Sequence, residues 1–582
     1  MYITAVPNRS SPPAILLRES YRQDGKVKTR TICNLSDWPK AKLDRFKRAL
    51  KAADGKSPKS KKRFGPFQIV RNLPYGHVAA ILGVLRQLGL EEMIAPKHSR
   101  QRDLAIALIV SRVLDPASKL ATLAGWHPDE ACHALGHLLK LGTVKPAELY
   151  EALDWLGSRQ QQIEDQLAAK YLKDGAMVLY DLTSTYYHGR CCPLAEYGYS
   201  RDQRRGLPQI NFGLLCNVDG APIAMEVVPG STSDAATVAA QVDKIRQRFG
   251  LGRVIMIGDR GMLTEARIRE DLRQAPGMDW VSALRSSAIR ELVEQRHLQP
   301  SFFDDTDLVE ISSPEYPGER LIACRNPLLA EERARKRQAL LNDTEKALER
   351  IAARTRQVRS PLRGAAKIGL AVGAIMDRWK MAKHFLLTIT DEAFTYQRDE
   401  EKIAREAALD GLYVIRTSVP EATLSASATV LAYKGLSKVE RAFRTMKTMD
   451  LRVRPIYHHL EGRVKAHLFL CQLAYLVEWR MRELLKPLLN DDEDLDGAMA
   501  ERQSAVQPAQ TSKAGKRKKS RQETDGKLPV SCFRGLIHRL GTQCLNLLQY
   551  EDESPDHWVL TKATRLQEQA YHLLGVEPKC SQ

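Results

Sequence analysis

The stretch that most constrains the fold begins at residue 176, where a strand pattern is followed at once by a hairpin pattern. Residues 176–183 (AMVLYDLT) are β-branched, aromatic and aliphatic apart from Asp181, which favours a strand. Residues 209–230 contain two apolar runs separated by Asp219-Gly220, a dipeptide typical of a tight hairpin turn. We therefore expect three strands, of which the last two are antiparallel.

Helices and one further strand follow this hairpin. Residues 234–250 are amphipathic at helical spacing and end at Gly250, a residue that commonly ends helices. Residues 253–261 (RVIMIGDRG) start with a pattern typical of a buried strand. Residues 263–274 predict another helix, which begins at Thr264. The order β-β-β-α-β-α predicts an α/β fold with a mixed sheet and helices on its faces.

The 582-residue chain is too long for a single core, so several modules are expected. The α/β pattern stops near residue 290 and resumes at the strand predicted over 410–418, which indicates an insertion with two hairpins and a long charged helix. A basic linker is expected over 54–63 and a flexible basic one over 511–527. The expected parts are a small β/α segment with its linker (1–65), a helical region (66–172), the first part of the core (173–290), the insertion lobe (291–397), the second part of the core (398–488), and a charged linker with a helical tail (489–582).

The net charge of the chain indicates which class of partner it favours. Lys and Arg number 89 against 70 Asp and Glu, a net charge of +19. Such an excess favours a polyanionic partner such as nucleic acid, although a merely soluble basic protein fits the charge equally well. The ten cysteines contain no CxxC pair, and neither a secretory signal nor a membrane-spanning run is present in the sequence. We therefore expect a cytoplasmic protein.

Two carboxylates stand at the ends of predicted strands. Asp181 lies within one strand, and Asp259 follows another before Arg260-Gly261. In open α/β sheets, ligands bind beyond the carboxyl ends of the strands. The first and fourth strands of the predicted order can be neighbours, which would bring Asp181 and Asp259 together. Two close carboxylates need a proton or a cation between them, and Mg²⁺ or Mn²⁺ suits oxygen ligands.

A third acid lies in the segment YKGLSKVERAFRTMK. In a helix, Glu440, Arg444 and Lys447 form a polar stripe beside an apolar stripe of other residues at the same spacing. Alone, this pattern most simply indicates a surface Glu440–Arg444 pair that contributes about 0.3–0.5 kcal/mol.

Together these motifs resemble the DDE transposases of bacterial insertion sequences. The resemblance is to the branch with a Tyr-x2-Arg-x3-Glu-x6-Lys signature, which Tyr433, Glu440 and Lys447 match, whereas Leu436 replaces the Arg. It also rests on YDLTST with Asp181, on IGDRGM with Asp259, and on the hairpin segment described above. It covers roughly residues 75–480.

The resemblance implies a ribonuclease-H-like core split by an insertion, and a transposase that binds terminal inverted repeats. Asp181, Asp259 and Glu440 would be catalytic and would hold two Mg²⁺ or Mn²⁺ ions for DNA cleavage and strand transfer. Lys447, Tyr433 and Arg444 would contact DNA, and the helical region at 66–172 would bind the DNA ends. The synaptic complex would contain a homodimer. The alternatives are a ribonuclease-H-like nuclease without strand transfer and an inactive DNA-binding derivative.

Overall fold

The computed structural model describes residues 1–8, 12–23, 26–53, 67–204, 206–448, 450–494, 497–498, 502, 504–550 and 556–579. The chain divides into two compact units. One consists of residues 1–70 and 548–557, and the other of 71–547 and 558–582. None of the described helices is long and apolar enough to cross a membrane.

The smaller unit contains an antiparallel three-stranded sheet and one helix. The sheet has the order β1-β2-β3. Leu17, Leu35 and Leu43 form a small apolar core between the sheet and α1. The strands and the helix expected in this small β/α segment are thus present, whereas the whole of the linker expected at 54–63 lies outside the described residues. The elements are β1 (Tyr2–Val6), β2 (Ala14–Gln23), β3 (Lys26–Asn34) and α1 (Lys40–Ala53).

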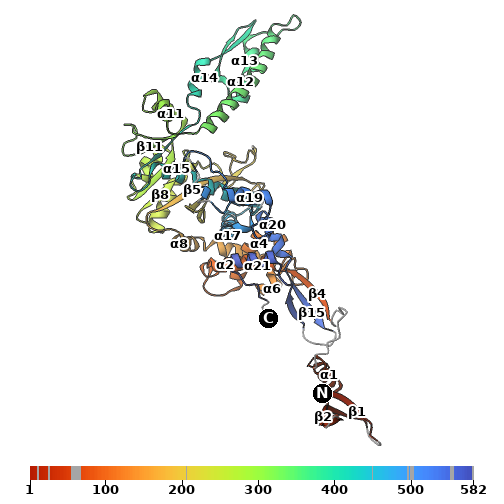
Figure 1. Ribbon diagram of the computed structural model, residues 1–582. Coiled ribbons are helices and arrows are strands. Elements are labelled where there is room, and N and C mark those ends of the chain that lie inside the picture. The colour runs from red at the N-terminus through yellow and green to blue at the C-terminus, as the bar shows by residue number, and fades with distance from the viewer. Residues whose placement is uncertain are drawn as a thin grey trace. The chain divides into compact units, whose positions relative to one another are not determined.

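The larger unit is built on an eight-stranded mixed sheet with the order β10-β11-β14-β9-β8-β5-β6-β7 (Figure 1). The hairpin predicted at Asp219-Gly220 joins β6 to β7, and Gly220 has a φ of 90°, which a residue with a Cβ rarely adopts. β5, β8 and β9 are parallel neighbours. Their bounds are β5 (Ala176–Tyr186), β6 (Gln209–Asn217), β7 (Pro222–Pro229), β8 (Val254–Ile257), β9 (Met278–Ala283), β10 (Leu308–Ile311), β11 (Arg320–Arg325) and β14 (Leu412–Thr417).

Helical crossovers join the parallel strands. The helix expected over 234–250 is present, but it is composed of a 3₁₀ turn, an α-helical turn and a π-helical turn. Thr264 begins the second crossover, where its side chain accepts a hydrogen bond from the backbone NH of Arg267. The elements are η1 (Asp234–Thr237), α9 (Val238–Asp243), η2 (Lys244–Arg248), α10 (Glu265–Arg267), η3 (Ile268–Leu272), α11 (Ser286–Glu294) and η4 (Pro300–Phe303).

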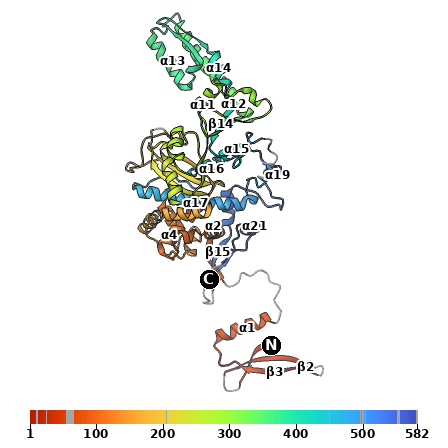
Figure 2. The same cartoon turned by 90° about the vertical axis from the view of Figure 1, so that its left-hand side faces the viewer.

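The helical region predicted before the sheet packs against α17 (Glu461–Leu485), a long helix that is buried along most of its length. Figure 2 shows α17 between the strands and the earlier helices α2 and α4. These helices share one apolar core with the sheet, so they are a layer of the same unit. The earlier helices are α2 (Gly76–Gln87), α3 (Leu90–Ile94), α4 (Arg100–Leu114), α5 (Lys119–Ala124), α6 (Leu135–Leu138), α7 (Pro146–Gly157) and α8 (Gln160–Tyr171).

The insertion is smaller than the expected lobe of 291–397. The first of its two hairpins, β10–β11, extends the central sheet, because β11 pairs with the edge of β14 and satisfies its backbone hydrogen bonds. The strand predicted at 410–418 is confirmed as β14, which also pairs with β9. A separate apolar core begins only at α12, where α12, α13, β12 and β13 pack together (Figure 1). These elements are α12 (Pro327–Thr355), α13 (Ala365–Trp379), η5 (Ala382–His384), β12 (Phe385–Ile389), β13 (Phe394–Arg398) and α14 (Glu400–Ala407).

The basic segment 511–527, expected to be a flexible linker, contains a helix. Ser512 caps this helix and donates a 2.7 Å hydrogen bond to Asp492, and Lys518 lies 3.0 Å from Glu493. The acidic patch before it therefore holds the basic segment in place. The remaining elements are β4 (Phe67–Pro74), α15 (Ala426–Lys434), α16 (Ser437–Lys447), η6 (Lys486–Leu488), α19 (Lys513–Arg521), α20 (Phe533–Gly541), β15 (Cys544–Tyr550), β16 (His557–Leu560) and α21 (Arg565–Leu574), and β16, β15 and β4 form a three-stranded sheet.

Candidate active site

The parallel pairing of β5 with β8 brings two acids to the same level of the sheet. Leu179 of β5 is paired with Ile257 of β8. Two residues further along each chain stand Asp181 and Asp259. Because side chains alternate between the faces of a sheet with a period of two, Asp181 lies on the same face of β5 as Leu179. Asp259 lies in the turn after β8, close enough for its charge to act on Asp181. The expectation that these two strands are neighbours is confirmed.

Asp259 is held by the turn that follows β8. Its Oδ1 accepts hydrogen bonds from the backbone NH groups of Gly261 at 3.0 Å and Met262 at 2.8 Å. Gly258 lets the chain turn here, since a Cβ at this position would lie 2.9 Å from Leu263. The second carboxylate oxygen of Asp259 is not used in these bonds, so it is available to a ligand.

The pKa of the Asp181 carboxyl group is far above that of an ordinary aspartate. Burial, and then the negative charge of Asp259, raise the pKa of Asp181 from 3.8 to about 7. A 2.8 Å hydrogen bond from the backbone NH of Leu182 and the charge of Arg201 act in the opposite direction without offsetting the rise. Near neutral pH the pair therefore shares a proton or attracts a cation.

Helices α15 and α16 cover the face of the sheet that carries these acids. Gly435, between the two helices, comes so close to β5 that a Cβ there would lie 3.5 Å from Leu179. The apolar stripe predicted on α16 is buried, and Phe443 packs edge-on against Phe212 of β6 with ring centroids 5.6 Å apart. This packing fixes the polar residues of α16 near the end of β5.

Glu440 is exposed on α16, but its charge acts on a residue that the charges of Asp181 and Asp259 also reach. Burial is the largest cause that raises the pKa of Tyr433 to about 12. The negative charges of Asp259, Asp181 and Glu440 also raise it. The phenol of Tyr433 thus lies within the influence of all three acids. Among the described residues, however, no three His, Cys, Asp or Glu side chains lie close enough together to hold a metal ion. The structure brings Asp181 and Asp259 together and leaves Glu440 at the margin.

Arg444 and Leu436 differ in their exposure. Arg444 is exposed, and within the ordered helix α16 it forms no ion pair with Glu440, so the simple surface pair is not present. Leu436, where the signature has Arg, is only 9% exposed and belongs to the apolar core.

Lys447, expected at the DNA surface, is instead buried. Its Nζ donates a 2.6 Å hydrogen bond to Thr183 and lies 3.4 Å from Asp202, which also pairs with Arg454. Burial lowers the pKa of Lys447 to about 8. A direct contact between Lys447 and DNA would require the lysine to leave Thr183.

Several polar residues near Asp181 were not predicted individually. Arg201 pairs with Asp234, and its backbone NH donates a 3.0 Å hydrogen bond to Ser184 of β5. Arg201 and Asp202 lie in the charged run SRDQRRG, which is unusual between two buried strands. That run was the available signal, but the sequence does not show which of its charges turn inward.

The Asp181–Asp259 pair fits a divalent cation. Both ligands are hard oxygen donors, and a cation would relieve the repulsion that raises the pKa of Asp181. Glu440 would have to approach to complete a three-acid set.

Comparisons with known proteins identify the family of the chain. The family model described as "Transposase DDE domain" matches residues 178–477, slightly more than half of the chain. The model described as "IS1634 family transposase, N-terminal domain" matches residues 3–62. The search of curated proteins found no match.

One similar solved structure is the cryo-EM structure of a piggyBac transposase synaptic complex with hairpin DNA. It is 10% identical, the match covers 71% of this chain and 77% of that chain, and the TM-score of 0.32 is too low to support an argument. The two family models show the family: the chain belongs to the DDE transposases of bacterial insertion sequences.

Proposed function

We propose that this transposase binds the terminal inverted repeats of its own insertion sequence and catalyses Mg²⁺-dependent DNA cleavage and strand transfer. The observation that carries the proposal is the level placement of Asp181 and Asp259 on neighbouring parallel strands, with the pKa of Asp181 raised to about 7. A pair of this kind costs stability unless it is used, and perturbed carboxylates gather at catalytic sites.

The proposed core is ribonuclease-H-like. In its support, β5, β6 and β7 form an antiparallel meander, and β8 and β9 add in parallel on the other side of β5. The order β9-β8-β5-β6-β7 is the one read from the sequence, extended by β9. The strands added beyond β9 connect this core to the insertion.

The proposed catalytic residues and metal ligands are Asp181, Asp259 and Glu440. Two bound Mg²⁺ or Mn²⁺ ions would supply activation of water or a 3′-hydroxyl and stabilisation of the leaving oxygen in phosphoryl transfer. The chain itself holds Asp259 through two backbone NH groups and holds the end of β5 through the bond from Lys447 to Thr183. These bonds keep the two aspartates in register before DNA arrives.

A transposase acts on DNA, and we assign its contacts as follows. Tyr433 of α15 is close enough to the three acids for their charges to raise its pKa, and Arg444 is exposed on α16 one turn after Glu440. We therefore assign both side chains to the DNA backbone near the reacting phosphate. Lys447 can do so only after releasing Thr183. The helical region at 66–172 is proposed to bind the transposon ends, and a homodimer would hold the two ends of one element together.

A joining assay tests the proposed function. The purified full chain is incubated with Mg²⁺, a plasmid carrying the element's own ends and a separate target plasmid. We expect cleavage at the ends and covalent joining to the target, both of which require Mg²⁺. Cleavage without joined products would favour the nuclease, and binding without cleavage would favour the inactive derivative.

A further inference from the structure

A second polar site lies away from the carboxylates. It is a cavity of about 490 Å³ between α5, the end of α4, α17 and the segment that connects α16 to α17. Its lining includes Arg112, Lys119, Arg452, Arg454, His458 and His467. None of the described residues lining it is an Asp or a Glu.

Three basic side chains form the floor of this cavity. Arg112 and Lys119 are each only 6% exposed, and His467 is 4% exposed. Lys and Arg side chains are rarely buried unless they are paired with an anion. In this cavity they come together from α4, α5 and α17.

The partners of these side chains are neutral. Lys119 Nζ lies 2.6 Å from Nδ1 of His467, and Nε2 of His467 lies 2.9 Å from the backbone oxygen of Val453. Since Nε2 must donate to that oxygen, Nδ1 accepts from Lys119 and the ring is neutral. Arg112 donates to the backbone oxygen of Leu451 at 3.4 Å. The hydrogen bonds therefore orient the basic groups without neutralising their charge.

Burial and neighbouring positive charges dominate the electrostatics of the basic side chains in this cavity. Burial, and then the charge of Arg112, lower the pKa of Lys119 to about 7. Burial, and then the charge of Lys119, hold the pKa of His467 well below its ordinary value and lower that of His458 to about 3. No carboxylate is among the groups that shift these three side chains. An anion in the cavity would stabilise the charged form of Lys119.

The mouth of the cavity suits a nucleotide chain. Tyr457 is 64% exposed and Leu120 is 56% exposed, so an aromatic ring and an aliphatic side chain stand beside the basic floor. Aromatic side chains next to cations are typical of surfaces that bind nucleic acid. Arg454 also lines the cavity and pairs with Asp202, the residue that contacts Lys447 beside the acids.

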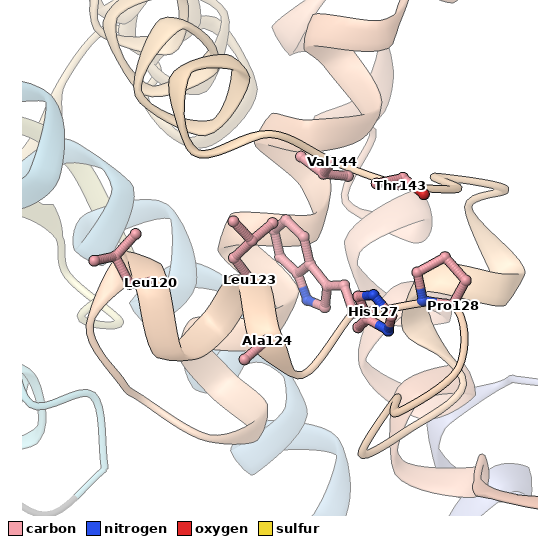
Figure 3. Close-up of a pocket in the computed structure, with 8 residues that line it drawn as sticks. Leu120, Leu123, Ala124, His127, Pro128, Thr143 and Val144 are labelled. Atoms are coloured by element: carbon pink, nitrogen blue, oxygen red, sulfur yellow. The ribbon is translucent and has the colours of Figure 1, made fainter.

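A neighbouring cavity offers a contrast. It has a volume of about 260 Å³ and shares Leu120 with the basic cavity, but its lining contains no Lys, Arg, Asp or Glu. Figure 3 shows Leu123 of α5 and Val144 of the segment before α7 among its lining residues. A phosphate group would find no Lys or Arg there, so of these two cavities the basic one is suited to an anion.

We propose that the basic cavity binds a backbone phosphate of DNA, with Lys119, Arg112 and His467 on its floor and Arg452 at its mouth. The inference rests on the proposed function, since it assigns a contact to the DNA on which the transposase acts. The convergence of buried Lys119 and Arg112 beside the neutral His467, with no carboxylate among the described lining residues, carries it. Arg454, which lines the cavity, pairs with Asp202, and Asp202 pairs with Lys447 at the end of β5. These two ion pairs would connect the bound phosphate to the strand that carries Asp181.

The salt dependence of DNA binding tests this site without any catalysis. Binding of the full chain to a 20-base-pair duplex is measured by fluorescence anisotropy in EDTA over a series of KCl concentrations. We expect Lys119→Met, which keeps the length of the side chain, to lower the slope of log K against log[salt] by about one. Exposed Lys173, which lines neither cavity, provides the control Lys173→Met with an unchanged slope.

Folding and ligand source are controlled separately. Arg452 is exposed, so Arg452→Gln should fold normally and should also lower the slope. Unchanged slopes in both variants overturn the proposal. Inorganic phosphate binding that Lys119→Met abolishes, with no change in the DNA slope, identifies a site for free phosphate and also overturns it.

Failure of the proposed function gives a different result. If the wild-type chain neither cleaves nor joins DNA with Mg²⁺ while the slopes of both variants fall, the phosphate site stands and only the catalytic assignment is lost. If cleavage and joining occur while the slopes are unchanged, only the phosphate site is lost.

Discussion

The substitution Asp181→Asn should stabilise the metal-free protein while removing its catalytic ligand. The rise of the Asp181 pKa from 3.8 to about 7 corresponds to about 4 kcal/mol of unfavourable free energy for the ionised carboxylate in the folded state. Asparagine keeps an oxygen that can accept the hydrogen bond from the NH of Leu182 but carries no charge. About 4 kcal/mol is therefore the upper limit of the gain.

The sign of this effect depends on pH. Below about pH 4, Asp181 is protonated in both the folded and the unfolded states, so the wild type and Asp181→Asn should be equally stable. As the pH rises from about 4 to about 7, the unfolded chain loses its proton first and the wild type loses stability relative to the variant. Above about pH 7 the difference should be constant.

Denaturant unfolding in EDTA at pH 5 and pH 8 measures this difference. We expect the variant to gain at least about 1 kcal/mol more at pH 8 than at pH 5. Exposed Asp243 provides the control Asp243→Asn, which should show no such dependence. Adding Mg²⁺ should stabilise the wild type, by about 2.7 kcal/mol at a hundred times its Kd, and leave Asp181→Asn unchanged. A variant no more stable than the wild type at pH 8 would refute the paired-carboxylate reasoning.

Three further predictions concern other groups. Asp259→Asn and Glu440→Gln should each abolish Mg²⁺-dependent cleavage in a nicking assay while sparing DNA binding, because each removes an anionic ligand; near wild-type cleavage in either variant removes that residue from the site. Lys447→Ala should lower the salt slope of DNA binding by about one, and an unchanged slope confines Lys447 to its contacts with Thr183 and Asp202. Arg416→Met should lower the free energy of unfolding by about 3–5 kcal/mol, because Arg416 is 4% exposed and pairs with the buried Glu319; a loss below about 1 kcal/mol in urea unfolding contradicts this.

The sequence was sufficient to predict the strands at the centre of the sheet. Strands with a strong local pattern, such as β5 and β8, were predicted, and their order made Asp181 and Asp259 neighbours. β9 was missed because its six residues, MDWVSA, are buried without a clear alternation. A short buried strand has no periodicity to separate it from a loop.

Long-range pairing accounts for the other differences. The β10–β11 hairpin was predicted, but its place in the central sheet depends on the edge of β14, about a hundred residues away in sequence. Lys447 was expected to contact DNA because of the resemblance to the transposase signature, whereas its contact with Thr183 depends on how α16 docks on β5. The pairing of Lys119 with His467 likewise joins α5 to α17. None of these contacts has a local signal in the sequence.

Anomalous diffraction from crystals of the full chain grown with Mn²⁺ tests the central claim most directly. The account predicts an anomalous peak in contact with carboxylate oxygens of both Asp181 and Asp259, and Glu440 turned towards the same site. Mn²⁺ bound only elsewhere, with these two aspartates free of metal at pH 8, would contradict it.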